Sequence, residues 1–336
     1  MQQFEITTNE AGQRFDKYLH KLMPGAPASF FYKMLRKKNI VLNGKKAEGK
    51  EKLNIGDKVS LFLSQETFEG FRGECKQDEY VSAYHNLDGI QVLFENEHMA
   101  LLHKPVGILS QKAKPEDNSV NEWFIGYLLA QKTISDESLA TYKPSICNRL
   151  DRNTSGIVIC AKTLAAGQEL SRLIAERKIR KFYRLFVKGT VKEPAELEGY
   201  LVKDHNKNKV KIVSGKEGEM LSLTKEEKAS YIQTRYEPIQ KLTDMTYLEV
   251  ELLTGKTHQI RAHLASAGYP LLGDYKYGNK EWNDYYQKKY GIKSQLLHAY
   301  RLEIPPNGLL LDGSELSVTD KEPVLFQKLL HENVRK

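Results

Sequence analysis

Apolar residues in the first 64 positions are spaced as in two short helices packed on a small sheet. From Phe15 to Met23 they follow i, i+3, i+4, i+7, i+8 spacing, which predicts one helix that ends at Pro24. A second helix is expected to run through Lys37, with Ser29 as its cap. The segments IVLNGKKA and GDKVSLFL predict strands, the first entering a turn at Asn43–Gly44.

The next segment, from residue 64 to residue 89, is polar and has no clear period, so we expect a linker with some local structure. From Ile90 onward, IQVLFENEHMALLHKP predicts two strands joined by a turn. The run GIVICAKT predicts a buried strand from Gly156, followed by a helix and the strand KFYRLFVKG. We therefore expect domains at 1–64 and 90–336, with a linker at 65–89.

The segment MTYLEVELLTGKTHQIRAHLASAGYPLLGDYKYG predicts a strand followed by a helix. Apolar and polar residues alternate over Leu248–Leu252, as in a half-buried strand that ends near Gly255. The helix is expected to start from a cap at Thr257, to turn Ile260 inward and to stop at Gly268.

Composition is that of a soluble globular protein. The chain has 336 residues, of which 40% are hydrophobic, and a mean hydropathy of −0.54. No apolar run approaches the roughly 20 residues of a membrane span and the N-terminus does not have the pattern of a signal peptide, so we expect a cytoplasmic protein without membrane contact. Cys75, Cys147 and Cys160 are odd in number and include no CxxC pair, which predicts reduced thiols.

The positive charge is concentrated at the N-terminus. Residues 1–64 hold 12 Lys and Arg against 6 Asp and Glu, which accounts for most of the net charge of +8. Such a stripe is either a solvated helix face or the surface of a phosphate-backbone binder. The candidate RNA-binding residues are Lys33, Arg36, Lys37, Lys38, Lys45 and Lys46.

Two segments resemble a cofactor-binding or metal-binding motif but do not complete it. The triplet GKT would belong to a phosphate-binding loop only if a glycine stood where Val250 stands. His258 and His263 are five residues apart, not four, and no acidic ligand accompanies them as in a zinc helix. The sequence therefore predicts neither a metal nor a nucleotide cofactor.

The stretch NRLDRNTSG carries the most unusual carboxylate of the chain. Asp151 stands between Arg149 and Arg152, in a loop that leads into a buried strand. Taken alone, such a loop is most often a salt-bridge cluster, although loops at strand ends are also where catalytic groups concentrate.

Two resemblances give these pieces a context. RFDKYLHKLMP, KKNIVLNGK and IGDKVSLFL resemble the S-four RNA-binding domain. RLDRNTSG, KFYRLFVKG and LLTGKTHQIRAHL, in that order and with HKPVGILS and LLHAYRLEIPP around them, resemble the RluA-type pseudouridine synthases, above all members that carry an S-four domain and act on large-subunit ribosomal RNA. One departure is Asn148, where the family commonly has His.

The resemblance implies an α+β fold: a catalytic domain with a mixed, mostly antiparallel sheet and a small α/β RNA-binding domain at the N-terminus. It implies that Asp151 is the essential catalytic residue, that Arg261 makes a salt bridge to it, and that Tyr183 stacks on the target base. Without the family, Tyr183 would be read as a plain core aromatic. The expected substrate-binding residues are Arg149, Arg152, His258 and, packing at the floor of the site, Ile260.

The implied reaction explains why one carboxylate suffices. Uridine becomes pseudouridine when the bond from uracil N1 to ribose C1′ breaks and C5 joins the same carbon, without redox change and therefore without a cofactor. Ordinary glycoside hydrolysis uses two carboxylates. Asp151 could attack C1′, add to the base or remove the C2′ proton, and the sequence leaves these routes open. Uracil in a stacked helix must first be flipped out, and Arg149 could fill the vacated space or hold the displaced phosphate.

Alternatives remain for substrate and class. Ribosomal RNA is the expected partner and transfer RNA a second possibility, with a monomer as the default state. A protein that only binds RNA would need the basic N-terminus but not Asp151, Tyr183 and Arg261 together. A nucleic-acid glycosidase would need a group that activates water.

Overall fold

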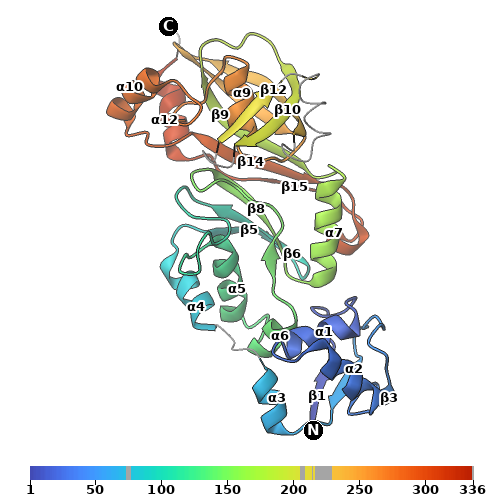
Figure 1. Ribbon diagram of the computed structural model, residues 1–336. Coiled ribbons are helices and arrows are strands. Elements are labelled where there is room, and N and C mark those ends of the chain that lie inside the picture. Colours follow the sequence, from blue (N-terminus) through green and yellow to red (C-terminus); the bar gives the residue numbers. More distant parts are fainter. Residues whose placement is uncertain (73–76, 205–208, 214, 216–228, 335–336) are drawn as a thin grey trace. The chain divides into compact units, whose positions relative to one another are not determined.

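The computed structural model describes residues 1–72, 77–204, 209–213, 215 and 229–334, and the chain divides into two compact units (Figure 1). Unit 1 comprises residues 1–101, 109–149 and 159–172, and unit 2 comprises residues 102–108, 150–158 and 173–336. The domain limits expected from the sequence, at residues 64 and 89, stay a prediction.

The N-terminal module of unit 1 is a four-stranded sheet with two helices. The sheet has the order β1-β4-β2-β3, in which β1 pairs with β4 and β2 with both β4 and β3, all antiparallel. Its elements are β1 (Gln2–Glu5), α1 (Phe15–Leu22), α2 (Ala28–Arg36), β2 (Ile40–Leu42), β3 (Lys45–Lys46) and β4 (Lys58–Leu61). The two helices, the strand β2 with its turn, and the strand β4 were predicted from the sequence, whereas β1 and β3 were not predicted as separate strands.

In this module the tight turn was predicted correctly, whereas the N-cap of the second helix was predicted at the wrong residue. Asn43 and Gly44 both have positive φ, 50° and 71°, which is the backbone of a tight two-residue hairpin. The cap of α2 is Pro27, so Ser29 lies inside the helix and was the wrong choice. Proline suits a helix start because its missing N–H has no partner to lose there.

The segment expected as a linker contains two helices, α3 (Gln65–Phe71) and α4 (Gln77–Asn86). Phe68 is buried in the core of the N-terminal module, so α3 belongs to that module. The helix α4 packs against α5 (Val120–Ala130), where a Cβ on Gly126 would come within 2.2 Å of the carbonyl oxygen of Tyr80. Only glycine permits that approach.

The large sheet is mixed and mostly antiparallel, which confirms the expected α+β class. Its hydrogen-bonded strand order in the described residues is β11-β10-β12-β13-β9-β14-β8-β6-β5, with β15 beside β14 and β7 beside β8. The pair β14 and β8 is parallel. The strands are β5 (Gln91–Glu95), β6 (Met99–Lys104), β7 (Ser145–Ile146), β8 (Ser155–Ala161), β9 (Arg180–Lys188), β10 (Ala195–Asp204), β11 (Lys209–Val213), β12 (Ser230–Lys241), β13 (Met245–Leu252), β14 (Leu297–Ile304) and β15 (Leu316–Thr319).

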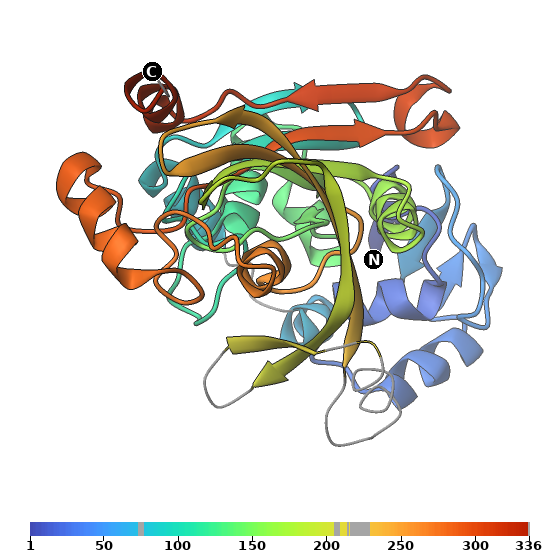
Figure 2. The ribbon, with the colours of Figure 1, turned by 90° about the horizontal axis from the view of Figure 1, so that it is seen from above.

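Helices of unit 2 cover its strands. The helices α10 (Lys280–Tyr290) and α12 (Val324–Glu332) supply Trp282, Tyr286, Phe326 and Leu329 to an apolar cluster with Phe186 of β9. The helix α9 (Gln259–Ser266) lies beside β10 and β12 in Figures 1 and 2 and contacts β11 and β12. The helix α7 (Leu164–Ala175), which belongs to unit 1 up to Arg172, follows β8. In unit 1, α6 (Asp136–Thr141) precedes β7.

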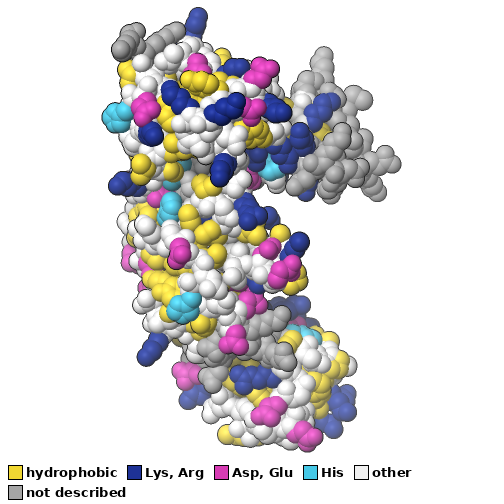
Figure 3. All heavy atoms as spheres, turned by 90° about the vertical axis from the view of Figure 1, so that its left-hand side faces the viewer, with side chains coloured by type: hydrophobic (Ala, Val, Ile, Leu, Met, Phe, Trp, Pro, Cys, Tyr) yellow, Lys and Arg dark blue, Asp and Glu magenta, His cyan; other side chains and the backbone are white. Residues whose placement is uncertain are grey.

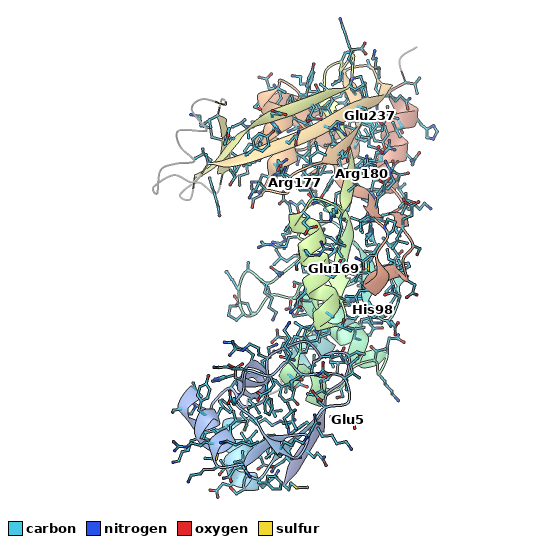
Figure 4. The ribbon with its side chains drawn as sticks, turned by 90° about the vertical axis from the view of Figure 1, so that its right-hand side faces the viewer. Glu5, His98, Glu169, Arg177, Arg180 and Glu237 are labelled. Atoms are coloured by element: carbon cyan, nitrogen blue, oxygen red, sulfur yellow. The ribbon has the colours of Figure 1, made fainter. Side chains whose placement is uncertain are left out.

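The strand β13 is buried on both faces rather than half-buried as predicted. Its polar side chains are covered because they pair with arginines of the neighbouring strands; Arg180 of β9, labelled in Figure 4, donates to Glu251 at 2.8 Å. A continuous row of such pairs crosses the sheet through Glu196, Arg235, Glu251, Arg180, Glu303, Arg301, Glu249 and Arg184. Buried charges are tolerated when they are paired in this way.

In the described part of the chain, no helix is both long and apolar enough to span a bilayer. Cys147 and Cys160 are free thiols, and Cys75 lies outside the described residues.

Candidate active site

Asp151 sits in unit 2, in the loop that enters β8, as expected from the sequence. Leu150 beside it is buried, and the N–H of Thr154 donates to the main-chain oxygen of Asp151 at 3.0 Å. The Asp151 side chain keeps 26% of its surface exposed. The loop therefore holds a carboxylate in a fixed place that a ligand can still reach.

Lys104, at the end of β6, connects this loop to residues 105–108 through hydrogen bonds. Its side chain is fully buried, and Nζ donates to the main-chain oxygens of Pro105 at 3.0 Å, Ile108 at 2.8 Å and Arg152 at 3.0 Å. The N–H of Gly107 also donates to Arg152 O, at 2.9 Å. Burial lowers the pKa of Lys104 to about 7, although the charge of Asp151 opposes the shift. Lys104 thus fixes the residue that follows the carboxylate, Arg152, against the segment 105–108.

Gly156 sets the course of β8 after the loop. It has φ 115°, and a Cβ there would lie 2.3 Å from the carbonyl oxygen of Ala299, its register partner on β14. A side chain at Gly156 would push the two parallel strands apart and move the loop that carries Asp151.

Arg261 of α9 pairs with two carboxylates at once. Its Nη1 donates to Asp151 Oδ2 at 2.8 Å, while Nε and Nη2 donate to the two oxygens of Asp274 at 2.7 and 3.0 Å. Asp274 is 1% exposed and also accepts from the N–H groups of Lys276 and Tyr277. Burial opposes ionisation of Asp274, but the hydrogen bonds and charge of Arg261 outweigh it and hold its pKa below the ordinary value.

His258, not Thr257, precedes the first residue of α9. It has a left-handed backbone, φ 56°, and makes no side-chain cap, so the predicted Thr257 cap was wrong. Its Nε2 lies 3.9 Å from Asp151 Oδ2 and its Nδ1 lies 2.9 Å from the hydroxyl of Tyr277. Burial is the main cause that lowers the pKa of His258.

Tyr183 and Ile260 are the apolar residues of the predicted site, and both belong to unit 2. Tyr183 lies on β9 and Ile260 on α9, and both side chains are buried. Burial, and after it the negative charge of Asp151, raise the pKa of Tyr183, so its hydroxyl is neutral. A neutral ring near the carboxylate suits stacking on a base.

The other predicted binding residues are exposed. Arg149 belongs to unit 1 and Arg152 to unit 2, where its Nε donates to Gly107 O at 2.9 Å. In the N-terminal module α2 packs on β2, which pairs with β3, and Lys and Arg side chains appear at several places on its visible face (Figure 3). All six predicted basic residues are exposed: Lys33, Arg36, Lys37, Lys38, Lys45 and Lys46.

Three residues of this site were missed from the sequence: Lys104, Asp274 and Tyr277. Each lies in a segment singled out for its pattern, HKPVGILS or LLGDYKYG, but no spacing rule connects those segments to residue 151. His263, by contrast, is buried and its Nδ1 lies 3.0 Å from Thr234 Oγ1. Among the residues described, no group of three or more His, Cys, Asp and Glu is placed to hold a metal ion.

Known proteins resemble the chain over nearly its whole length. The family model "RNA pseudouridylate synthase" matches residues 98–266. A protein of Haemophilus influenzae named ribosomal large subunit pseudouridine synthase C is 29% identical, over 96% of this chain and 94% of its own. One of Neisseria meningitidis named ribosomal large subunit pseudouridine synthase D is 27% identical, over 87% of this chain and 72% of its own.

Among solved structures, human RNA pseudouridylate synthase domain containing 4 matches with a TM-score of 0.56 and 20% identity, covering 76% of this chain and 96% of that one. At this identity the match shows a shared fold.

Proposed function

The chain belongs to the RNA pseudouridylate synthase family and is an enzyme that isomerises uridine in RNA, and we propose that its substrate is large-subunit ribosomal RNA, with Asp151 as the essential catalytic residue. The relatives named for the ribosomal large subunit, which match over most of both chains, support this substrate. Such an enzyme would work in the cytoplasm.

The single observation that carries the catalytic assignment is the ion pair between Asp151 and Arg261. Arg261 is 8% exposed on its side chain and is fixed from behind by Asp274, so it presents one N–H to a carboxylate that solvent still reaches. A positioned, ionised carboxylate is what all three routes require: attack on ribose C1′, addition to the base or removal of the C2′ proton.

The surrounding residues suit a flipped nucleotide. Tyr183 would stack on uracil, Ile260 would close the apolar floor, and His258 would contact the base or sugar. Arg149 and Arg152 would hold the displaced backbone. Flipping costs a few kcal/mol and least in loops and bulges, which favours unpaired uridines as targets. The basic residues of the N-terminal module, an S-four-like domain by resemblance, would add contacts to phosphates.

The test compares wild type, Asp151→Asn and Asp312→Asn on unmodified ribosomal RNA, with pseudouridine mapped by carbodiimide labelling and primer extension. Asp312 is an exposed carboxylate after α11 (Gly308–Leu311) with φ 50°, a backbone that Asn accepts, so its variant controls for loss of a charge. We expect stops from wild type and Asp312→Asn only, and RNA binding by all three.

Activity of Asp151→Asn above a few percent of wild type would contradict the catalytic assignment. Stops on transfer RNA and none on ribosomal RNA would keep the chemistry and overturn the substrate.

A further inference from the structure

His258 and Tyr277 form a hydrogen-bonded pair whose proton positions follow from their neighbours. The N–H of Val210, on β11, donates to the Tyr277 hydroxyl oxygen at 2.9 Å. That oxygen therefore acts as an acceptor toward the main chain and still has its own proton to donate. Within the described residues, the partner that the structure offers this proton is His258 Nδ1 at 2.9 Å. Nδ1 then carries no proton.

The remaining ring nitrogen must carry the proton of the neutral imidazole. Burial lowers the pKa of His258, and the positive charges of Arg261 and Lys276 act in the same direction, while Asp151 and Asp274 oppose it. The ring is accordingly neutral near pH 7, with its N–H at Nε2. Nε2 lies 3.9 Å from Asp151 Oδ2, which is beyond hydrogen-bond reach, so its N–H does not donate to the carboxylate.

The backbone of His258 points the same way. Its left-handed conformation, φ 56°, is strained for a residue other than glycine and persists only where the surroundings impose it. His258 occupies the N-cap position of α9 without capping the helix, and its ring contacts the Tyr277 ring edge-on at 5.6 Å between centroids. The His258 side chain is therefore held by its contact with Tyr277 and not by a hydrogen bond to the end of the helix.

We propose that Tyr277 is a positioning residue that fixes the Nε2–H tautomer of His258, and that this N–H donates a hydrogen bond to a carbonyl oxygen of the reacting uracil. This proposal rests on the proposed function. As the N1–C1′ bond breaks, its electron pair leaves with uracil, and the ring spreads the negative charge over its carbonyl oxygens. A fixed N–H donor there stabilises the charge as it develops.

The step needs no proton transfer from His258. The electron pair returns from C5 to C1′, C5 loses its proton and N1 gains one, so the isomerisation balances without a co-reactant. A neutral donor suits this site better than an imidazolium, which would pair with Asp151 and neutralise the carboxylate.

The first experiment is nitrogen-15 NMR of full-length protein labelled at the histidine rings, with the His258 signals identified by their loss in His258→Asn. Wild type should show an unprotonated Nδ1 and a protonated Nε2, and Tyr277→Phe should show protonation at Nδ1. Tyr275→Phe is the matched control, since Tyr275 is exposed and its hydroxyl bonds to Asp284 and Gln287. A wild-type proton on Nδ1, or an unchanged tautomer in Tyr277→Phe, would overturn the proposal.

The second experiment measures kcat and KM on the RNA that wild type modifies. Tyr277→Phe should lower kcat about 3- to 10-fold, the worth of one hydrogen bond, with little change in KM. Its unfolding midpoint should fall modestly, because the Val210 N–H loses its acceptor. His258→Gln, whose amide nitrogen reaches the place of Nε2, should keep more activity than His258→Asn, although Asn suits the left-handed backbone better. Equal or greater activity of the Asn variant would refute the donor at Nε2.

Failure of the proposed function can be told apart from failure of this inference. If the wild type modified neither ribosomal nor transfer RNA, the proposed function would be refuted, and with it the contact between His258 and uracil. The tautomer measurement does not depend on activity, so it would still decide the role of Tyr277.

Discussion

Replacing Asp274 by Asn should separate the support of Arg261 from its contact with Asp151. The guanidinium makes two hydrogen bonds to Asp274 and one to Asp151. Asn keeps the shape of Asp but has one acceptor oxygen instead of two. If that oxygen keeps its bonds to the N–H groups of Lys276 and Tyr277, the amide NH₂ must face Arg261, so that two donors meet.

The magnitude follows from burial. Asp274 is 1% exposed on its side chain and Arg261 8%, so solvent cannot compensate the lost charge. Removing one partner of a buried ion pair costs about 3–5 kcal/mol. Because Arg261 retains Asp151, we expect the lower end, about 3 kcal/mol of unfolding free energy. A guanidinium that has lost its Nε bond to Asp274 Oδ2, together with the charge of Asp274, should also lower turnover by roughly 100-fold.

The assay pairs urea unfolding with single-turnover pseudouridine formation, and Asp312→Asn serves as the matched charge control. Asp312→Asn should stay within about 0.5 kcal/mol of wild type in unfolding free energy, as exposed substitutions do. An Asp274→Asn protein with wild-type stability and turnover would refute the reasoning, because the buried pair would then contribute nothing to either.

Three further outcomes test other parts of the structure. Gly156→Ala should lose at least about 3 kcal/mol in urea unfolding, because its Cβ would lie 2.3 Å from Ala299 O; a loss under about 1 kcal/mol would mean the strands can separate. Relative to Lys104→Met, wild type should gain unfolding free energy from pH 7 to pH 9, since the folded lysine, with a pKa of about 7, has released a proton that the unfolded chain, near 10.5, still binds; parallel pH curves would contradict the shift. Lys45→Ala with Lys46→Ala should reduce the slope of log affinity for RNA against log salt by about 0.7 to 0.9 for each phosphate that the variant no longer neutralises, and an unchanged slope would remove β3 from the RNA-binding surface.

Local sequence signals predicted the elements well where a short-range rule was sufficient. The spacing from Phe15 to Met23 predicted α1, and Asn43–Gly44 predicted the hairpin, because helix periodicity and positive φ are properties of neighbouring residues. The caps at Ser29 and Thr257 were wrong because nearby residues, Pro27 and His258, occupy those positions instead. The preference of Ser and Thr for the N-cap position does not show which of several adjacent residues will occupy that position.

Burial was harder to predict than the elements themselves. The alternating pattern of β13 indicated a half-buried strand, yet Glu249 and Glu251 are covered because arginines from β9, β12 and β14 pair with them. A polar residue looks exposed in sequence until its partner on another strand is known. The polar segment before residue 89 likewise forms α3 and α4, whose apolar residues are few but include the buried Phe68, Tyr80 and Ala83.

By itself the sequence determined the family, the α+β class and the central pair of the site, because the motifs around Asp151 and Arg261 are specific and strongly patterned. Only the tertiary structure brought Lys104, Asp274 and Tyr277 to that pair. They lie 47, 123 and 126 positions from residue 151 in the chain, and their roles depend on which carbonyls, guanidinium and imidazole they reach. Such contacts are products of the folded sheet and of α9, and hydrogen-bond geometry between distant segments has no counterpart in local spacing.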